Sequence, residues 1–359
     1  MSRGVLIVRD ASLILAGRPA EFKKSESRSL GVKSFEYARP ETEAEAVAFL
    51  GEVESTAILA GGTDLTSLLR AELVTPVRVV DLKRIPSLHE VSKVDDGIQI
   101  GSLVTLEDLA RHPLLSNYRS LFDVVDGVRA IQVQGSGTLG GDLCHLPNCW
   151  YFRSGYGLLA MENGESLPEA GDNRYHAILG NSGPAKFVNA SRFAPALIAW
   201  GAHVRIIGPG PEQAEWLPLE YFYLTPRSNA QGNTILKPGQ LISHVWLPDA
   251  GRLASATYEV MQMEGLDWPL ASAAATLKLE SGIVRQASIV MGHVAPVPWV
   301  AQEASRLLIG QPLNEETAGL AADTAVARAT PMSMNEYKVQ LARTAVKRAL
   351  LKAADQSTV

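Results

Sequence analysis

Up to about residue 90, short apolar runs alternate between the spacing of strands and the spacing of helices. Runs of strand type lie at 56–60 and 77–82, each bounded by turn residues. Runs of helical type follow Thr42, which begins a capping box, and Asp64, which can cap a second helix. The order is β-α-β-α-β, so residues 34–90 are predicted to form a small α/β subdomain.

From Gly97 the pattern changes to shorter elements separated by more turn residues. Residues 97–101 and 203–207 alternate like strands, and a long glycine-rich region lies between them, from 135 to 183. We assign residues 91–230 to a larger α+β subdomain.

The last part of the chain returns to longer elements. Apolar runs at 272–279 and 283–294 flank Ser281-Gly282 and predict a hairpin. Three amphipathic helical stretches follow, at 300–309, 314–329 and 335–354. Prolines and polar residues cluster between about 225 and 253, so we place the domain boundary there, a C-terminal domain at 253–355 and a polar extension at 1–33.

Composition narrows the class of protein. A chain of 359 residues, 46% hydrophobic and 20% charged, is typical of a globular protein with more than one domain. The net charge of −5 argues against a nucleic-acid-binding protein, and no apolar run reaches the roughly 18 residues that span a bilayer. Two cysteines, Cys144 and Cys149, favour a reducing compartment, the cytoplasm, over a disulfide framework.

Two glycine motifs carry the candidate chemistry. In the first, a strand leads into adjacent glycines whose backbone N–H groups can approach an anion, with a hydroxyl and a carboxylate beside them. A tight turn without a ligand is the alternative interpretation. The motif consists of Leu59, Ala60, Gly61, Gly62, Thr63, Asp64 and Leu65.

The second motif formally matches the dinucleotide fingerprint, with Gly135, Gly137 and Gly140 in the required positions. That fingerprint needs a helix directly after the glycines, whereas Pro147 and an aromatic run follow here. We therefore expect a loop that contacts another part of a large cofactor. Two such loops predict a ligand with an extended diphosphate, and the sequence contains no P-loop.

The ordered series of motifs resembles the FAD-binding medium subunit of the xanthine dehydrogenase family of molybdenum hydroxylases. The series comprises 58–65, 79–82, 100–101 and 137–141, with 292–296 in the C-terminal part. The resemblance implies an α+β fold. Residues 34–230 would form a vanillyl-alcohol-oxidase-type (PCMH) FAD-binding domain of two subdomains, followed by a C-terminal domain with a three-stranded antiparallel sheet and helices.

The resemblance also implies which residues hold FAD. These are the first motif and, in the second, Thr138, Gly140, Gly141 and Asp142. Ile242 corresponds to an apolar position beside the flavin. Trp268 falls where the family approaches the flavin ring, and it could shield that ring or serve as a core residue.

The sequence departs from the family at several positions. Asp142 replaces an asparagine, and its charge repels a diphosphate unless it accepts hydrogen bonds from ribityl hydroxyls or backbone N–H groups. Arg192 replaces an aspartate, and Asp172 is a candidate for the lost acceptor. Three positions that are often basic in the family read Glu259, Met261 and Met263, which argues against an NAD site.

An insert at 144–183 resembles the aldehyde-oxidoreductase branch, whose flavin subunits carry a [4Fe–4S] cluster. Such a cluster needs about four thiolates, so we expect none here and no bound metal. A metal held by Cys144, Cys149, His145 and His176 is the weaker alternative to a buried thiol and surface histidines. Trp150, Tyr151 and Phe152 are expected to pack in place of the cluster.

The resemblance implies an oxidoreductase subunit that transfers electrons and has no catalytic residue of its own. A molybdopterin-binding large subunit would oxidise the substrate, and [2Fe–2S] clusters of a small subunit would pass electrons to this FAD and on to an external acceptor. Export with a partner stays open. Two alternatives remain: a self-contained PCMH-type FAD oxidoreductase, and a scaffold that has lost FAD.

Overall fold

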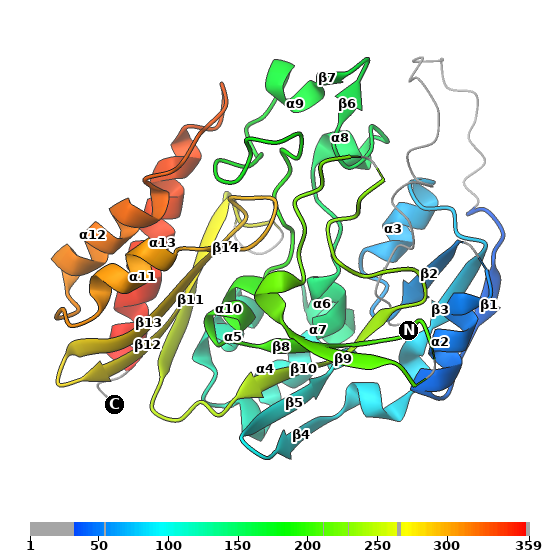
Figure 1. The fold of residues 1–359 in the computed structure, drawn as a ribbon, viewed down its shortest axis with the longest axis horizontal. Coiled ribbons are helices and arrows are strands. Elements are labelled where there is room, and N and C mark those ends of the chain that lie inside the picture. The colour runs from blue at the N-terminus through cyan, green and yellow to red at the C-terminus, as the bar shows by residue number, and fades with distance from the viewer. Residues whose placement is uncertain (1–31, 54, 211, 229, 264–266, 357–359) are drawn as a thin grey trace.

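The computed structural model describes residues 32–53, 55–210, 212–228, 230–263 and 267–356. Three regions lie side by side in Figure 1: a small sheet with its helices, a five-stranded sheet, and a C-terminal sheet with long helices. The expected N-terminal extension lies almost wholly outside the described residues.

The small subdomain has the predicted β-α-β-α-β order. Its strands are parallel in the order β1-β3-β2. Thr42 begins the first helix as predicted, because its hydroxyl accepts a hydrogen bond from the Glu45 N–H. The elements are β1 (Glu36–Ala38), α2 (Glu43–Gly51), β2 (Thr56–Leu59), α3 (Leu65–Arg70) and β3 (Arg78–Asp81).

The second sheet is antiparallel and has the strand order β4-β5-β10-β8-β9. Its central strand, β10, lies beyond residue 230, so the sheet extends past the end that we expected for this domain. The sequence pattern does not predict β10, because Ser243 and His244 interrupt its apolar run and prolines flank it. The strands are β4 (Val91–Val94), β5 (Gly97–Gly101), β8 (His203–Ile207), β9 (Ala214–Pro218) and β10 (Leu241–Pro248).

Helices pack on this sheet and form the largest apolar core with it. They are α4 (Leu106–Arg111), α5 (Arg119–Gly127), α6 (Ile131–Ser136), α7 (Leu139–Leu143) and α10 (Ala194–Ala199). Short 3-10 turns occur at Leu82–Arg84, Pro86–His89, Pro113–Leu115 and Leu219–Tyr221.

The C-terminal domain has a four-stranded antiparallel sheet, so the expected three strands were one too few. The fourth strand, β14, has two residues and pairs with Val290 and Met291. The predicted hairpin turn at Ser281-Gly282 is confirmed, and both residues have positive φ. The elements are β11 (Ala254–Val260), β12 (Ala271–Glu280), β13 (Ile283–Gly292), β14 (Trp299–Val300), α11 (Gln302–Leu308), α12 (Glu315–Val326) and α13 (Tyr337–Gln356).

The C-terminal domain is joined to the second sheet along α5 and β11. The Ser120 N–H donates to Ser255 Oγ at 3.1 Å, and the Thr257 hydroxyl donates to the Ser120 carbonyl at 3.0 Å. Both hydroxyls are buried, and buried polar groups are costly to leave unpaired. These bonds therefore fix the position of the C-terminal domain against the helices.

The insert lies at one end of the molecule, between the small subdomain and the C-terminal helices (Figure 1). Asn173 fastens it to the segment before α13, because its side chain donates to Ser333 Oγ at 3.0 Å and accepts from the Met334 N–H at 2.9 Å. Its elements are α8 (Trp150–Arg153), β6 (Met161–Glu162), β7 (Glu165–Ser166) and α9 (Leu167–Ala170).

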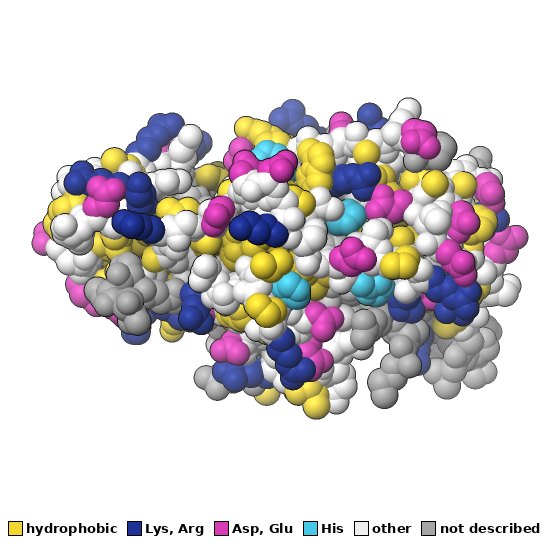
Figure 2. Space-filling view, turned by 90° about the horizontal axis from the view of Figure 1, so that it is seen from below, with side chains coloured by type: hydrophobic (Ala, Val, Ile, Leu, Met, Phe, Trp, Pro, Cys, Tyr) yellow, Lys and Arg dark blue, Asp and Glu magenta, His cyan; other side chains and the backbone are white. Residues whose placement is uncertain are grey.

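The surface agrees with the acidic composition. On the face drawn in Figure 2, acidic and basic side chains of the described residues are interspersed, with no continuous basic patch. None of the helices in the described residues combines the length and apolar character needed to cross a bilayer.

Candidate functional site

The two glycine motifs, which are far apart in sequence, touch each other. A Cβ atom on Gly61 would lie 2.2 Å from the Ser136 carbonyl oxygen and 3.1 Å from Gly137 Cα. Real Cβ atoms do not approach a carbonyl so closely, so this contact requires glycine. Gly62 has φ of 71°, which also favours glycine. The predicted pair of loops is therefore a single structural unit.

The second loop is tied to the five-stranded sheet. The Gly140 N–H donates to the Ser102 carbonyl at 2.9 Å, and the Leu139 N–H donates to the Val104 carbonyl at 3.0 Å. A Cβ on Gly140 would lie 2.6 Å from Ser102 Cβ, so this glycine permits close packing. The helix at this loop, α7, begins at Leu139, before the last glycine of the fingerprint, and has five residues. The prediction that no dinucleotide-binding helix follows the glycines is thus confirmed.

A cavity of about 320 Å³, here called the glycine-loop pocket, opens between the two loops and the C-terminal domain. Six predicted residues line it, namely Thr63, Asp64, Thr138, Gly141, Asp142 and Trp268. The other residues of the two motifs, Leu59, Ala60, Gly61, Gly62, Leu65 and Gly140, are not among its lining residues. Ile242 is 2% exposed in the core of β10 and does not line the pocket, so its expected place beside the flavin stays a prediction.

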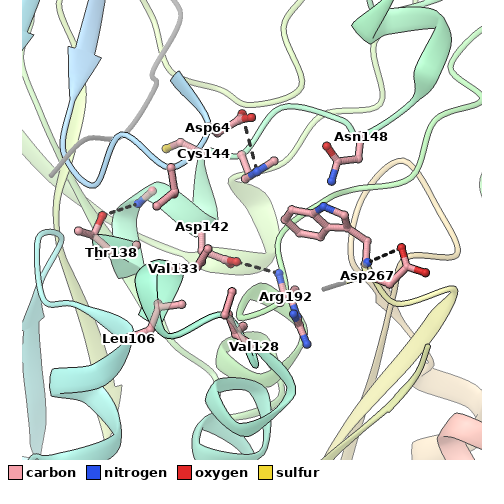
Figure 3. A pocket seen from close by; sticks show the side chains of 16 residues that line it. Asp64, Leu106, Val128, Val133, Thr138, Asp142, Cys144, Asn148, Arg192 and Asp267 are labelled. Atoms are coloured by element: carbon pink, nitrogen blue, oxygen red, sulfur yellow. Dashed lines mark hydrogen bonds and ion pairs between the residues drawn. The ribbon is translucent and has the colours of Figure 1, made fainter. Parts of the chain in front are cut away.

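The Asp142 side chain points toward the chain that leads into α10 (Figure 3). Its carboxylate accepts from the Ser191 hydroxyl, from the Arg192 N–H at 3.1 Å and from the Phe193 N–H at 3.0 Å. Burial raises the pKa of Asp142, and these hydrogen bonds oppose the shift. Backbone N–H groups therefore satisfy this carboxylate, and it serves to hold the segment before α10.

Arg192, on the wall of the same pocket, forms a buried ion pair with Glu259 of β11. Its Nε lies 3.0 Å from Glu259 Oε1, and its Nη2 contacts the other oxygen. The two side chains are 8% and 5% exposed. Burial raises the pKa of Glu259, and the Arg192 charge opposes that effect. The pair joins the pocket wall to the C-terminal sheet.

Asp64 binds Arg153 of the insert. The Arg153 guanidinium donates to both carboxylate oxygens, at 2.7 and 3.3 Å, and also to the carbonyls of Pro147 and Leu146. The prediction that the Asp64 side chain caps α3 is wrong, because it makes no capping hydrogen bond. The Arg153 guanidinium, at the end of α8, binds the Asp64 carboxylate instead.

The cysteines and histidines of the insert do not gather at one point. Cys149 Sγ lies 3.2 Å from His176 Nε2, whereas His145 Nε2 lies 3.7 Å from Asp64 and packs edge-on against Trp268. In the described part of the chain, no three His, Cys, Asp or Glu side chains form a group that could hold a metal ion.

The insert's aromatic helix packs only in part as expected. Phe152 is buried in the small subdomain core, but Trp150 is 38% exposed. Asp172, the candidate acceptor near the pocket, pairs with Arg174 at the surface and does not line the pocket. That expectation is therefore wrong.

Sequence reasoning missed part of the pocket wall. Val128, Ala130 and Val133 line it from the segment before the second loop, and Asn148 and Asp267 line it from the insert and the C-terminal domain. No glycine or hydroxyl pattern marks the three apolar residues. Asp267 could have been predicted as a lining residue because it directly precedes Trp268.

Comparison with known proteins then decides the family. Residues 33–250 match the model of the FAD binding domain in molybdopterin dehydrogenase, and residues 256–353 match the CO dehydrogenase flavoprotein C-terminal domain. The chain belongs to this family. It is an FAD-binding oxidoreductase subunit, and the recognition made from the sequence motifs is confirmed.

Relatives match over nearly their whole length. The aldehyde oxidoreductase FAD-binding subunit PaoB of Escherichia coli is 28% identical, over 91% of this chain and 100% of its own. The carbon monoxide dehydrogenase medium chain of Hydrogenophaga pseudoflava is 26% identical, over 88% of this chain and 96% of its own length. The structure of quinoline 2-oxidoreductase from Pseudomonas putida 86 shares the fold, with a TM-score of 0.72 at 23% identity, covering 92% of this chain and 100% of that chain.

Proposed function

We propose that this chain binds FAD in the glycine-loop pocket and transfers electrons within a molybdenum-hydroxylase-type complex. The observation that carries the proposal is the direct contact of the two glycine loops at Gly61 and Ser136, with a cavity beside them. A single loop would suit many anions, whereas two loops joined at one cavity suit an elongated ligand with a diphosphate in its middle.

The residues present fit such a ligand. Gly61 and Gly62 are buried, yet their N–H groups donate no hydrogen bond to any other described residue. Buried N–H groups are rarely left unpaired, so these two, which directly precede the lining residue Thr63, are candidates to hold a diphosphate at the edge of the pocket. Thr63 adds a hydroxyl next to them, and Thr138 and Gly141 of the second loop line the same pocket. FAD bound here would accept and release electrons singly or in pairs.

The far end of the pocket suits a flat ring. Trp268 presents an indole there, packed edge-on against His145 with ring centroids 4.7 Å apart. Aromatic side chains exclude water and pack well against planar ligands. We therefore assign Trp268 to the flavin ring and the two loops to the diphosphate. We also assign the FAD-binding region, 34–250, to the PCMH type.

The names of the relatives suggest the rest of the complex. One is a medium chain of a carbon monoxide dehydrogenase and another is the FAD-binding subunit of an aldehyde oxidoreductase. We propose that a molybdopterin-binding large subunit oxidises the substrate and that a [2Fe–2S] small subunit delivers the electrons. This chain then passes them to an external acceptor. We place the complex in the cytoplasm.

The test is flavin retention by a variant that separates the two loops. Gly61→Ala places a Cβ against the Ser136 carbonyl, whereas Gly183→Ala is a matched control because nothing lies within 4 Å of its Cβ. We expect stoichiometric FAD by absorbance in the wild type and the control, and loss of most FAD in Gly61→Ala. A folded wild-type chain that retains no FAD, even with its partners, would contradict the proposal and favour a scaffold.

A further inference from the structure

His145 is a titratable side chain in the wall of the glycine-loop pocket. It follows α7 of the second glycine loop, and its ring packs edge-on against Trp268 with ring centroids 4.7 Å apart. Its side chain is 13% exposed, so the ring is neither sealed in the core nor free in solvent. Because we assign Trp268 to the flavin ring, His145 lies on the side of the pocket where that ring would bind.

The hydrogen bond at Nδ1 of His145 fixes which nitrogen of the neutral ring carries the proton. Nδ1 lies 2.7 Å from the Leu146 carbonyl oxygen. A carbonyl oxygen can only accept a hydrogen bond, so Nδ1 donates and holds the proton. Nε2 of the neutral ring therefore has a lone pair, and it is the nitrogen of this ring that can take up a further proton.

Nε2 of His145 faces a carboxylate. It lies 3.7 Å from Asp64 Oδ2, which is an ion-pair distance but longer than a hydrogen bond. Neither the lone pair of Nε2 nor the carboxylate oxygen can donate, so the neutral ring gains nothing from this contact. A proton on Nε2 turns the contact into an attraction between imidazolium and carboxylate, which is strengthened because Asp64 is only 16% exposed.

The other charged and titratable groups near His145 offer no spare positive charge. These groups are Asp64, Arg153, Asp142, Cys144, Arg192, Asp267 and His293. Each of the two guanidinium groups already has a carboxylate partner. Burial raises the pKa of Cys144 and lowers that of His293 to about 3, so both side chains are neutral. Among these groups, no cation is therefore left to offset a negative charge that arrives in the pocket, and only His145 can supply one.

We propose that His145 takes up a proton at Nε2 when electrons reach the flavin, and holds it against Asp64 until they leave. Two electrons come from the [2Fe–2S] partner of the proposed function. The proton comes from solvent and returns there when the external acceptor removes the electrons, so the N–H bond at Nε2 is the one bond made and broken on the protein. The coupling is reciprocal, because a proton that binds more tightly after reduction also favours reduction. This inference rests on the proposed function and assigns a proton-accepting residue to it.

Two substitutions remove the proton site but keep polar contacts. His145→Asn retains an amide N–H in the place of Nδ1, next to the Leu146 carbonyl, and His145→Gln puts an amide in the place of Nε2. Neither amide takes up a proton. His203→Asn and His203→Gln are matched controls. His203 Nδ1 also lies against a carbonyl, that of Gly201 at 3.2 Å, but His203 is on β8 and does not line the pocket.

The measurement is the midpoint potential of FAD bound to the full chain, by spectroelectrochemical titration at saturating FAD between about pH 6 and pH 9. We expect the potential of the wild type and the controls to fall more steeply with pH than that of both His145 variants. The slopes should differ by up to about 30 mV per pH unit, because one further proton per two electrons changes the potential by this amount for each tenfold change in proton concentration.

Equal slopes in all five proteins would overturn this inference and leave the proposed function in place. A shifted potential with an unchanged slope in both His145 variants would also overturn it, because His145 would then act on the flavin without binding a proton. Loss of FAD from both variants would overturn it in favour of a binding role. A wild-type chain that binds no FAD would overturn the proposed function together with the inference.

Discussion

Arg153 holds both carboxylate oxygens of Asp64, at 2.7 and 3.3 Å, although the two residues are 89 positions apart. Asp64 ends the first glycine loop, and Arg153 ends the aromatic helix α8 of the insert. The side chains are 16% and 21% exposed, so water screens the pair only partly. The insert therefore fixes the loop that we assign to the diphosphate.

Arg153→Met should weaken FAD binding and lower the free energy of unfolding by about 1–3 kcal/mol, because it leaves a partly buried carboxylate without its charged partner. FAD titration and urea unfolding measure the two effects. Arg174→Met is the matched control, since it removes an exposed pair with Asp172 and should change little. If both substitutions change FAD binding and the free energy of unfolding equally, Arg153 does not hold the first glycine loop in place.

The buried pair Arg192–Glu259 should behave as a unit. Arg192→Met leaves Glu259 charged and buried, which should cost about 3–5 kcal/mol in urea unfolding. The double variant with Glu259→Met should recover most of this loss, because it removes both charges. The single variant Glu259→Met completes the comparison. If the loss of unfolding free energy in the double variant equals the sum of the losses in the two single variants, the two side chains act independently.

The two buried histidines should lower the stability of the protein in mild acid. Burial lowers the pKa of His293 to about 3 and that of His176 to about 4, whereas an unfolded histidine titrates near 6.5. Between these values the unfolded chain binds protons that the folded chain does not. The free energy of unfolding should therefore rise with pH, by up to about 1.4 kcal/mol per pH unit for each histidine.

Urea unfolding between about pH 4.5 and pH 6 measures this slope. His293→Asn should reduce it, because asparagine does not titrate and tolerates the positive φ of this position. His203→Asn, at a partly exposed histidine on β8, is the control for a change of histidine to asparagine. An unaltered slope in His293→Asn would contradict the buried, neutral state of His293.

Trp268→Ala should weaken FAD binding about fivefold, the usual worth of one aromatic contact, and Trp268→Phe should restore most of the affinity. Fluorescence titration with FAD measures both. Trp216→Ala, on the edge strand β9, is the control. If Trp268→Ala binds FAD as well as the wild type does, Trp268 is a packing residue and not a cover for the flavin ring.

The sequence predicted local structure well where one short segment decides it. The Thr42 side chain caps its helix, the β-α-β-α-β unit forms, and the turn at Ser281-Gly282 adopts positive φ. The two glycine motifs were also predicted. A Cβ atom at Gly61 or Gly140 would collide with Ser136 or Ser102, so both positions require glycine. Each of these features depends on neighbouring residues or on a close contact with the backbone that only glycine allows, so it can be recognised in the sequence.

Relationships between distant segments could not be predicted in this way. Asp64 was expected to cap α3, but Arg153 from the insert binds it. The charge of Asp142 was expected to repel a diphosphate unless ribityl hydroxyls or backbone N–H groups satisfied its oxygens, and only the fold shows that the N–H groups of Arg192 and Phe193 do so. Ile242 faces the core because β10 is a central strand, which no local pattern reveals.

β10 is the last of its five strands in the chain, yet it lies in the middle of their sheet. During synthesis, β5 and β8 therefore emerge from the ribosome long before the strand that joins them, and each keeps an unpaired edge until residue 248 has been added. Unpaired edges invite aggregation, so this interval is when a nascent chain most needs a chaperone. Asp267 and Trp268 follow later still, so the glycine-loop pocket gains its C-terminal wall only after residue 268 has been added.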